Sequence, residues 1–321
     1  MYKKNRIAVI IPAYNEEKLI IPTLRNVPSY FDRIYVVDDG SKDHTRQRVL
    51  NYRKKFDRRI KLVSHERNKG LGEAIITGYK VAAKDKNDVI FVVGGDFQMD
   101  LSEAEKFIIP IINNEVDFVK GNRFLYSKNI KEDMPFVRFA GNSILSLLTK
   151  FATGYWKIYD SNDGYTAIKR EVIEKIDWDS AYKKYGYNGD WMALFNLANV
   201  RIKDVPRRPI YLKGERQSQI RIGKYIITVA PRLLYRFFWR IKKKYLSYNF
   251  HPLALFYFIG FIIFSFGFFL GIYLLIRAIK YYPDPVPGTK AILASMFLIM
   301  GTLFLLFALL LDVQDNEKLQ P

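Results

Sequence analysis

A short acidic motif follows a buried-strand pattern in the first third of the chain. Residues 89–93 are all apolar, too few to cross a membrane but typical of a strand buried on both faces of a parallel sheet. Asp96 and Gln98 come soon after it, and alternate residues of an extended segment point the same way. Carboxylate and amide oxygens suit a hard cation, so the pair predicts Mg²⁺ or Mn²⁺ bridging a diphosphate. A solvated acid in a surface turn is the alternative.

Two further loops of similar chemistry follow apolar runs. The letters IPAYNEE come after the first run, and VVDDGSKD ends the second. Ligands bind outside the carboxyl ends of parallel strands, so we expect these loops to clamp a nucleotide sugar. Asp38 and Asp39 would accept hydrogen bonds from base or ribose, and Asp96 with a metal would neutralise the diphosphate. Each acid alone also fits a helix cap, as Asp43 and Asn15 do, but the serial position at strand ends favours binding.

The elements that must position these loops alternate between strand and helix patterns. We expect strands at residues 7–11, 33–37, 60–63, 89–93, 116–119 and 166–168 and near 205, and helices at 16–25, 45–56, 73–83, 136–155 and 190–199. This alternation predicts an α/β fold with a Rossmann-like, mostly parallel, right-handed sheet. The half after residue 115 is less regular, which fits a substrate region built onto the sheet.

The composition restricts the partners. The 321 residues carry a net charge of +19, which implies an anionic partner such as nucleic acid, an anionic membrane surface or a phosphorylated substrate. The basic residues cluster beside apolar segments and no nucleic-acid recognition motif is present, so we expect no nucleic acid partner. The absence of cysteine excludes disulfides and Cys-ligated zinc, and the three histidines lack metal-ligand spacing. The start MYKKNR runs straight into a strand pattern, so no signal peptide is expected.

Residues 213–250 form a basic amphipathic segment. Its apolar residues recur every three or four positions, the spacing of one helical face: Ile222, Ile226, Val229, Leu233, Phe237, Ile241 and Tyr245. Between them lie Lys224, Arg232, Arg236, Arg240, Lys242, Lys243 and Lys244. With Trp239, this pattern predicts helices in the lipid headgroup layer, divided at Pro231 because proline removes an internal hydrogen bond. An ordinary helix covering the sheet is the alternative.

Two uncharged segments follow, at residues 253–276 and 291–311. A span needs ~20 apolar residues for a ~30 Å hydrocarbon core, so both are long enough, and the proline-rich linker 277–290 predicts a two-span hairpin. The density of Lys and Arg before the first span places the soluble part in the cytoplasm. We expect a multi-pass protein of the cell membrane, with a cytoplasmic domain over 1–212, interface helices over 213–250, a membrane region over 251–312 and a cytoplasmic tail over 313–321.

Four motifs resemble, in order and spacing, those of the family 2 glycosyltransferases, which have the GT-A fold: IPAYNEE, VVDDGSKDHT, NKGLGEA and GGDFQ. The later part resembles the polyprenyl-phosphate glycosyltransferases, a group that includes dolichol-phosphate mannose synthases and bacterial glucosyltransferases. That likeness depends on GNRF, DSNDGYTAI, YNGDWMAL and VPRRPIY…GERQSQIR. Together the motifs cover nearly the whole chain.

The resemblance implies roles for individual residues. The expected donor nucleotide-binding residues are Pro12, Tyr14, Glu16, Asp38, Asp39, Lys69, Gly70 and Asp96, and the expected metal ligands are Asp96 and Gln98. The expected acceptor phosphate-binding residues are Arg123, Arg138, Asn142 and Arg216, since guanidinium groups bind phosphate through paired hydrogen bonds. The expected catalytic residues are Asp96, Arg123 and Asp190, the last near the donor sugar. Each arginine alone also fits a solvated surface charge, and Arg216 and Arg221 fit a lipid-headgroup contact.

The chain departs from the family pattern at two positions. The family usually has Asp-x-Asp at the fourth strand end, but Gly94 stands at the first of these places, so Asp96 and Gln98 are the ligands left from that strand. Metal binding would then be weaker, or would depend on the diphosphate and water. Asn142 stands where related mannose synthases tend to have serine.

The resemblance implies an inverting transfer of a hexose, mannose or glucose, from a nucleoside-diphosphate sugar to a polyprenyl or dolichyl phosphate at the cytoplasmic membrane face. GDP-mannose is the favoured donor and UDP-glucose the next. A phosphate acceptor is ionised at neutral pH and needs positioning rather than a general base. The alternative is a glycolipid or polysaccharide hydroxyl acceptor, for which Asp190 or Asp163 would be the base. A third hypothesis is an inactive scaffold that only binds nucleotide sugar, for which Gly94 is the sole support.

Overall fold

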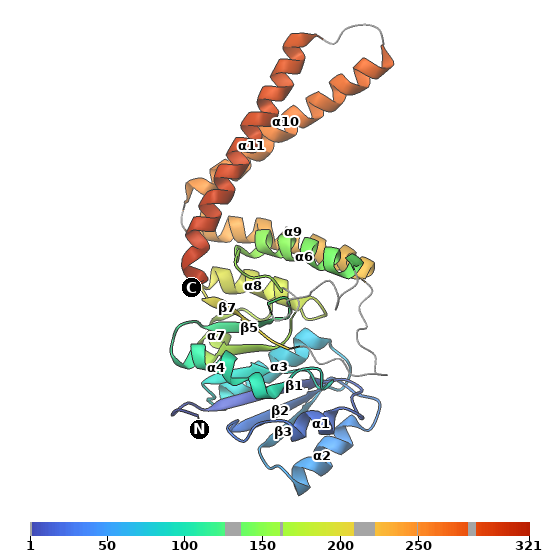
Figure 1. The fold of residues 1–321 in the computed structure, drawn as a ribbon, viewed down its shortest axis with the longest axis vertical. Helices are drawn as coiled ribbons and strands as arrows, with labels where there is room; N and C mark the ends of the chain where they lie inside the picture. The colour runs from blue at the N-terminus through green and yellow to red at the C-terminus, as the bar shows by residue number, and fades with distance from the viewer. Residues whose placement is uncertain (1, 126–135, 161–162, 209–221, 249, 282–286) are drawn as a thin grey trace. The chain divides into compact units, whose positions relative to one another are not determined.

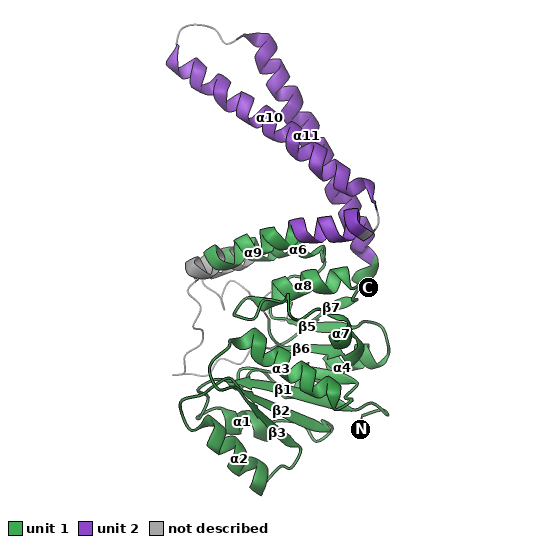
Figure 2. Cartoon of the chain, turned by 180° about the vertical axis from the view of Figure 1, so that it is seen from behind, with its two compact units in different colours: residues 1–237, 318–321 green, residues 238–317 purple. Residues whose placement is uncertain are grey.

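In the computed structural model the chain divides into two units, which Figure 2 shows in different colours. Unit 1 comprises Met1–Phe237 and Lys318–Pro321, and unit 2 comprises Phe238–Glu317. The structure describes residues 2–125, 136–160, 163–208, 222–248, 250–281 and 287–321. The sequence pattern set a first boundary at residue 212, whereas in the structure most of the basic helix that follows belongs to unit 1.

Unit 1 contains a sheet whose described strands are ordered β3-β2-β1-β4-β6-β5-β7 (Figure 1). The strands are β1 (Ile7–Ala13), β2 (Arg33–Asp38), β3 (Ile60–Ser64), β4 (Val89–Val92), β5 (Phe118–Asn122), β6 (Thr166–Lys169) and β7 (Ile202–Pro206). Strand β1 pairs in parallel with β2 and β4, β2 with β3, and β5 with β7, whereas β6 runs antiparallel to β4 and β5. The other six strands therefore point the same way, which confirms the expected mostly parallel sheet. Their carboxyl ends lie along one edge.

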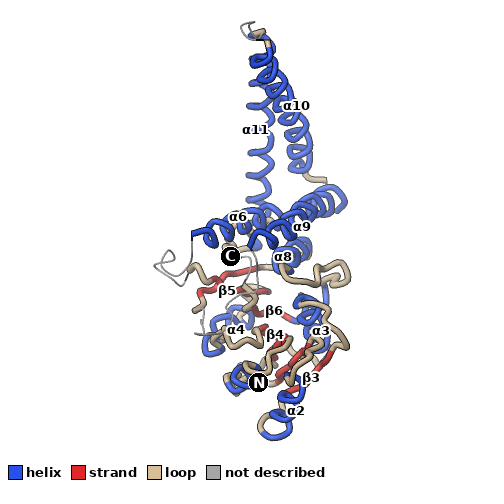
Figure 3. The backbone as a smooth tube through the Cα atoms, turned by 90° about the vertical axis from the view of Figure 1, so that its right-hand side faces the viewer, coloured by secondary structure: helices blue, strands red, loops and turns tan. Residues whose placement is uncertain are grey.

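Helices cover both faces of the sheet, so the residues of its central strands are buried on either side and are nearly all apolar. The helices of unit 1 before the basic segment are α1 (Ile20–Arg25), α2 (Thr45–Lys55), α3 (Leu71–Lys84), α4 (Glu105–Ile112), α6 (Phe136–Thr153), α7 (Arg170–Lys175) and α8 (Tyr187–Leu197), with a 3₁₀ turn at Leu101–Glu103. On β1, Val9 joins a core cluster that includes residues of α1 and α4. Ile10 points the other way, where a Cβ on Gly78 of α3 would lie 2.6 Å from its Cγ2, so only glycine lets α3 pack this closely. Figure 3 shows α3 and α4 on opposite sides of the sheet.

The first helix begins later than the expected residue 16. The backbone amides of Asn15, Glu16 and Glu17 donate to the side chains of Ser41 (3.0 Å), Thr45 (2.8 Å) and Asp43 (3.1 Å) in the loop after β2. These tertiary hydrogen bonds hold the residues after β1 in a turn, so α1 starts at Ile20. The turn joins the first two strand ends.

The predicted break at Pro231 is wrong, because Ile222–Lys242 form one helix, α9, with the proline inside it. Proline removes one internal hydrogen bond, but the helix is held on both sides of it. Val229 and Leu233 form a buried apolar cluster with Leu145 and Ala152 of α6. These apolar residues of α9 therefore pack against α6, whereas the sequence pattern favoured the lipid headgroup layer for this face. The packing also keeps the helix continuous at Pro231.

Unit 2 contains two long apolar helices, α10 (Pro252–Lys280) and α11 (Gly288–Asn316), after a π-helix at Lys243–Tyr248. Both have a mean hydropathy of 2.5 and are long and apolar enough to cross a membrane. The expected spans lie inside them. The helices approach each other at glycines: a Cβ on Gly301 would lie 2.4 Å from the backbone nitrogen of Phe264. Small residues allow this close packing between apolar helices.

A buried ion pair connects the end of α9 to the end of α11 within unit 2. Nη1 and Nη2 of Arg240 donate to Oδ1 and Oδ2 of Asp312 at 2.7 and 2.8 Å, and both side chains are 0% exposed. The Tyr245 hydroxyl adds a hydrogen bond to Oδ1 of Asp312 at 3.0 Å. The amphipathic pattern had assigned Arg240 to the headgroup layer, whereas its partner at the end of an apolar helix buries it.

Candidate active site

The loops after β1, β2 and β4 meet at the carboxyl edge of the sheet. Asp39 N donates to the carbonyl of Ala13 at 2.9 Å, and Gly95 N donates to the carbonyl of Pro12 at 3.3 Å. Tyr14 and Glu16 follow on the same loop, Tyr14 exposed and Glu16 partly buried. The structure thus brings the expected donor residues of β1 next to the acidic ends of the two neighbouring strands.

Asp39 ties the end of β2 to the loop that precedes α3. Its Oδ1 accepts from the backbone amide of Lys69 and its Oδ2 from that of Gly70, both at 2.9 Å. The ring nitrogen Nδ1 of His65 lies 2.6 Å from Oδ1. Gly70 has a φ of 103°, a conformation that favours glycine. Asp39, Lys69 and Gly70, three of the expected donor residues, therefore form one hydrogen-bonded unit.

Asp38 is buried and shapes the neighbouring turn. Its Oδ1 accepts from the backbone amide of Ser41 at 3.1 Å, as expected of an acid that closes a loop. The chain crosses closely here, because a Cβ on Gly40 would lie 2.6 Å from the carbonyl carbon of Arg67. Both acids of the pair are engaged with the protein, so their contacts with base or ribose stay a prediction.

Asp96 carries a partly buried carboxylate without an ion-pair partner in the described part of the chain. Burial raises the pKa of Asp96 above its ordinary value, against the smaller opposing effects of hydrogen bonds, chiefly from the amide of Gln98, and of the Arg207 charge. That amide lies 3.3 Å from Oδ1. A Cβ on Gly94 would lie 2.9 Å from the same oxygen, so a side chain at position 94 would require Asp96 to move.

The donor set at this strand end fits a hard cation. The described residues contain no group of three or more His, Asp or Glu that could hold a metal, so the protein offers few ligands of its own. The Asp96 carboxylate and the Gln98 amide oxygen are nonetheless oxygen donors of the kind that Mg²⁺ and Mn²⁺ prefer. A partly buried carboxylate that has no ion-pair partner among the described residues is suited to bind a cation. The remaining ligands would have to come from a diphosphate and water.

Arg123, directly after β5, is held by a buried acid. Its Nε and Nη2 donate to Oδ2 and Oδ1 of Asp160 at 2.7 and 2.9 Å, and its backbone amide donates to Oδ2 at 3.2 Å. Burial acts to raise the pKa of Asp160, but the charges of Arg123 and Lys120 outweigh burial and hold that pKa well below its ordinary range. The Arg123 side chain remains partly exposed, so it can reach a ligand while Asp160 fixes its orientation.

Two further ion pairs surround this arginine. Nε of Arg207, directly after β7, lies 2.5 Å from Oδ2 of Asp163, and both side chains are buried. The same oxygen of Asp163 lies 3.7 Å from Nε of Arg123. Nζ of Lys120 donates to the carbonyl of Asp160 and lies 3.7 Å from Oδ1 of Asp204. The edge thus carries alternating cations and anions from three strands.

Tyr185 lies in the loop before α8, and the residue is 55% exposed. Partial burial, and then the negative charge of Asp96, raise the pKa of its hydroxyl, and Arg123 opposes them. Glu16 raises it further. The three charges that act on this hydroxyl come from the loops after β1, β4 and β5. The metal-binding role expected of Asp96 and the phosphate-binding role expected of Arg123 stay predictions.

Asp190, in the first turn of α8, is fully engaged by other residues. Its Oδ1 accepts from Nε of Arg232 and Nε of Arg236, both at 2.6 Å. Its Oδ2 accepts from Nη2 of Arg236 and from the backbone amide of Tyr182, both at 2.9 Å. The side chain is 1% exposed. Its expected position near the donor sugar receives no support from these contacts.

Some expected site residues have no described side chain. The backbones of Arg138 and Asn142 belong to α6, but their side chains are outside the described part of the structure. Arg216 and Arg221 lie outside the described residues altogether. The acceptor roles of Arg138, Asn142 and Arg216 stay predictions, as does the lipid-headgroup contact considered for Arg221.

The sequence reasoning missed four residues at the edge: Lys120, Asp160, Arg207 and Tyr185. One signal was available for Lys120, because a lysine inside the otherwise apolar strand FVKGN must find a buried acid. The others depend on contacts between segments far apart in the sequence, which spacing does not reveal.

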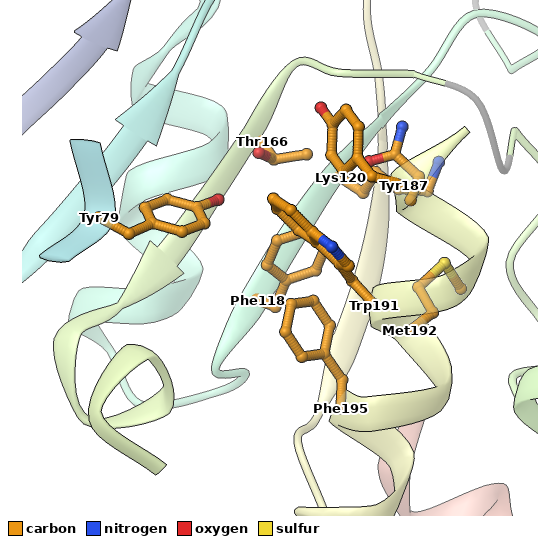
Figure 4. A pocket seen from close by; sticks show the side chains of 9 residues that line it. Tyr79, Phe118, Lys120, Thr166, Tyr187, Trp191, Met192 and Phe195 are labelled. Atoms are coloured by element: carbon orange, nitrogen blue, oxygen red, sulfur yellow. The ribbon is translucent and has the colours of Figure 1, made fainter. Parts of the chain in front are cut away.

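A small cavity separates α8 from the sheet (Figure 4). Its lining includes Tyr79, Phe118, Lys120, Thr166, Tyr187 and Trp191. The space measures about 10 Å³, enough for about one water molecule. The cavity is therefore a gap in an aromatic core and not a sugar site.

Comparison with known proteins identifies a family. The model of glycosyl transferase family 2 matches residues 8–177. A UDP-N-acetylglucosamine–dolichyl-phosphate N-acetylglucosaminyltransferase of Methanococcus voltae is 32% identical over 68% of this chain and 91% of its own. A dolichol-phosphate mannosyltransferase of Pyrococcus furiosus is 28% identical over 54% of this chain and 48% of its own. One similar solved structure is that of glucosyl-3-phosphoglycerate synthase from Mycobacterium tuberculosis, crystallised with Mn²⁺, UDP-glucose and glycerol 3-phosphate. It superposes with a TM-score of 0.52 and covers 73% of this chain and 80% of its own, at 18% sequence identity. This similarity shows the same GT-A-like fold.

Proposed function

The chain belongs to glycosyl transferase family 2, and we propose that it transfers a hexose from a nucleoside-diphosphate sugar to a polyprenyl or dolichyl phosphate. Relatives named as dolichyl-phosphate glycosyltransferases support this acceptor class. They are named for different sugars, N-acetylglucosamine and mannose, so the sugar must be found by experiment. We favour GDP-mannose as donor and UDP-glucose next, and we include UDP-N-acetylglucosamine in the test.

One observation supports the proposal most directly: Asp96 follows β4 and Arg123 follows β5, and both strands pair with β6, so the two residues come at neighbouring places on the carboxyl edge of the sheet. The two expected phosphate-handling groups, one through a cation and one directly, would thus serve the same region. Transfer between a sugar diphosphate and a lipid phosphate brings two anions together, so cationic groups must reduce their repulsion. A site for this reaction needs this combination of groups on one side of the sheet.

The described acids favour a phosphate acceptor over a hydroxyl acceptor. A hydroxyl needs a general base within reach of its proton. The two acids considered for that role are occupied: Asp190 accepts from two arginines, and Asp163 pairs with Arg207. A phosphate needs only to be placed opposite the leaving diphosphate, with inversion at the sugar carbon, and Arg123 can orient it through two parallel hydrogen bonds.

Asp96 and Gln98 would hold the divalent cation, which supplies positive charge to the departing diphosphate when it is bound. Asp39 would keep the loop of Lys69 and Gly70 in place for the nucleotide. We propose that Pro12, Tyr14, Glu16 and Asp38 complete the donor site, and that Arg138, Asn142 and Arg216 complete the acceptor site.

The apolar helices fit an enzyme of the cell membrane. We propose that α10 and α11 are the two spans and that the catalytic domain lies on the cytoplasmic face, because Lys and Arg are dense just before the first span. A hairpin returns the chain to its starting side, and the last residues, Lys318–Pro321, do belong to unit 1. A lipid-linked phosphate stays at the membrane surface, so an anchored enzyme remains near its acceptor.

The test is sugar transfer by the purified full chain. It is incubated with radiolabelled GDP-mannose, UDP-glucose or UDP-N-acetylglucosamine, with Mg²⁺ or Mn²⁺, and with polyprenyl phosphate in vesicles. We expect one donor to label an acid-labile lipid fraction, and Asp96→Ala to reduce the label to background. The absence of label with every donor would contradict the proposal and would support a nucleotide-sugar-binding scaffold.

A further inference from the structure

The loop of residues 177–186, between α7 and α8, is held at its start by α9. Nη2 of Arg236 donates to the carbonyl of Ser180 at 2.7 Å, and Nη2 of Arg232 donates to the same carbonyl at 3.3 Å. Asp190 binds both arginines and also the amide of Tyr182. The two arginines are four residues apart, so they lie on the same face of α9. One carboxylate therefore joins α8, α9 and the loop backbone.

The same loop contacts the donor side of the sheet. The amide of Glu73 in α3 donates to the carbonyl of Lys183 at 3.0 Å, and Nζ of Lys183 lies 3.3 Å from the Glu73 carboxylate. A Cβ on Gly70 would lie 2.8 Å from the carbonyl oxygen of Lys183, and one on Gly72 would lie 2.9 Å from its carbonyl carbon. The loop therefore lies directly against the segment that Asp39 holds.

The loop therefore lies beside the candidate donor site. Gly70, against which the carbonyl of Lys183 packs, donates its backbone amide to Asp39 at 2.9 Å. The side chains of Asp190 and Arg236 are 1% and 2% exposed, which leaves no room for a ligand to reach this carboxylate without displacing α9. A residue that contacts substrate or the reacting atoms would have to be accessible.

We infer that Asp190 is a positioning residue: it locks the basic helix α9 to loop 177–186 and thereby holds this loop against the segment of Lys69 and Gly70 in the candidate donor site. Since α9 is the helix that we expect in the headgroup layer, this lock links the membrane-facing helix to the active site. The identity of the site as a sugar-transfer centre rests on the proposed function, but the lock itself does not.

The first test is cleavage by trypsin, which needs no substrate, because Lys183 and Lys184 lie in the loop. We expect Asp190→Asn and Arg236→Gln to raise the rate of cleavage there at least tenfold, on the order of the change in open population that a lost anchor produces. Arg232→Gln, at a 34% exposed side chain, should raise it less and serves as the variant least prone to misfolding. Asp179→Asn is the control, since Asp179 lies in the same loop and its side chain is 90% exposed. Unchanged cleavage in the first two variants would overturn the inference.

The second test separates positioning from catalysis by kinetics on the full chain in vesicles. A misplaced loop should lower kcat/KM about 10- to 100-fold in Asp190→Asn and in Arg236→Gln alike. The double variant should be no worse than either single one, because both remove the same lock. All variants should keep the wild-type pH profile. Loss of the acid limb in Asp190→Asn alone, with a multiplicative loss in the double variant, would show instead that Asp190 is a base. A wild-type chain that transfers no sugar would contradict only the proposed function, and the cleavage test would still decide the lock.

Discussion

The guanidinium of Arg123 and the carboxylate of Asp160 form a two-point pair, with Nε and Nη2 2.7 and 2.9 Å from the two oxygens. A side chain held this way has little freedom to lose when it binds a phosphate. The pair also brings together the end of β5 and the segment before β6. Loss of the Asp160 carboxylate should therefore affect both the stability of the protein and its catalytic activity, and each effect can be measured separately.

Replacing Asp160 by asparagine should destabilise the protein and impair catalysis. Above the ordinary pKa of an aspartate, the depressed pKa of Asp160 contributes stability, and that contribution is lost as pH falls through the folded-state value. We expect Asp160→Asn to lower the free energy of unfolding at pH 7 by about 3 kcal/mol, as for a broken buried pair. The deficit should shrink in acid. Denaturant unfolding at pH 7 and at a pH well below the ordinary aspartate pKa measures both, with Asp177→Asn at an exposed position as control.

The opposite sign is expected at Asp96. Its pKa is raised by burial, so its contribution to stability is present below the ordinary aspartate pKa and is lost as pH rises through the folded-state value. Asp96→Asn should therefore increase the Tm of the metal-free protein at pH 7 and leave it unchanged at a pH where Asp96 is protonated. Mn²⁺ with a nucleoside diphosphate should raise the Tm of the wild type, and this gain should be absent from the variant. If Asp96→Asn has a lower Tm than the wild type at pH 7, burial of the Asp96 charge does not destabilise the protein. If the Tm of the variant still rises with Mn²⁺ and a nucleoside diphosphate, Asp96 is not a ligand of the metal.

Much of the fold follows from local patterns, and much of the site does not. Apolar runs such as residues 89–93, each followed by polar loops, place the strands and order their carboxyl ends, which is why Asp39 and Asp96 come at the same edge of the sheet, on either side of β1. The acidic partners of Arg123 and Arg207 are 37 and 44 residues away in the sequence. The periodic spacing of apolar residues gives no information about contacts over such sequence separations.

Local rules also fail where tertiary contacts outweigh them. Pro231 should end a helix by its own chemistry, but burial of the neighbouring apolar face against α6 keeps α9 continuous. Asp190 matches a position near the sugar in the family pattern, while its observed partners are the arginines of α9. In both cases the residue type suggested one role, and contacts with segments far away in the sequence give the residue another.

The Arg240–Asp312 pair predicts how unit 2 responds to charge loss. Asp312→Asn leaves a buried guanidinium without a counter-ion, which costs about 3–5 kcal/mol. Asp315→Asn removes the same charge from a more accessible pair, in which the side chains of Lys244 and Asp315 are 13% and 26% exposed, and it keeps an acceptor oxygen for the Tyr245 hydroxyl, so the loss should be smaller. Thermal unfolding of the full chain in detergent compares the two. Equal shifts in Tm would indicate that the buried pair does not stabilise the helical hairpin.

The most direct test of the proposed chemistry compares two acceptors that differ only in the phosphate. The wild-type enzyme, in vesicles with its preferred donor and Mn²⁺, is given polyprenyl phosphate or the polyprenol of the same chain length. We predict transfer to the phosphate only, and a loss of about 10²- to 10³-fold in kcat on Arg123→Gln, as for removal of a donor that stabilises developing charge. Equal transfer to the alcohol, with Arg123→Gln unimpaired, would contradict a site built to bring a sugar diphosphate and a lipid phosphate together.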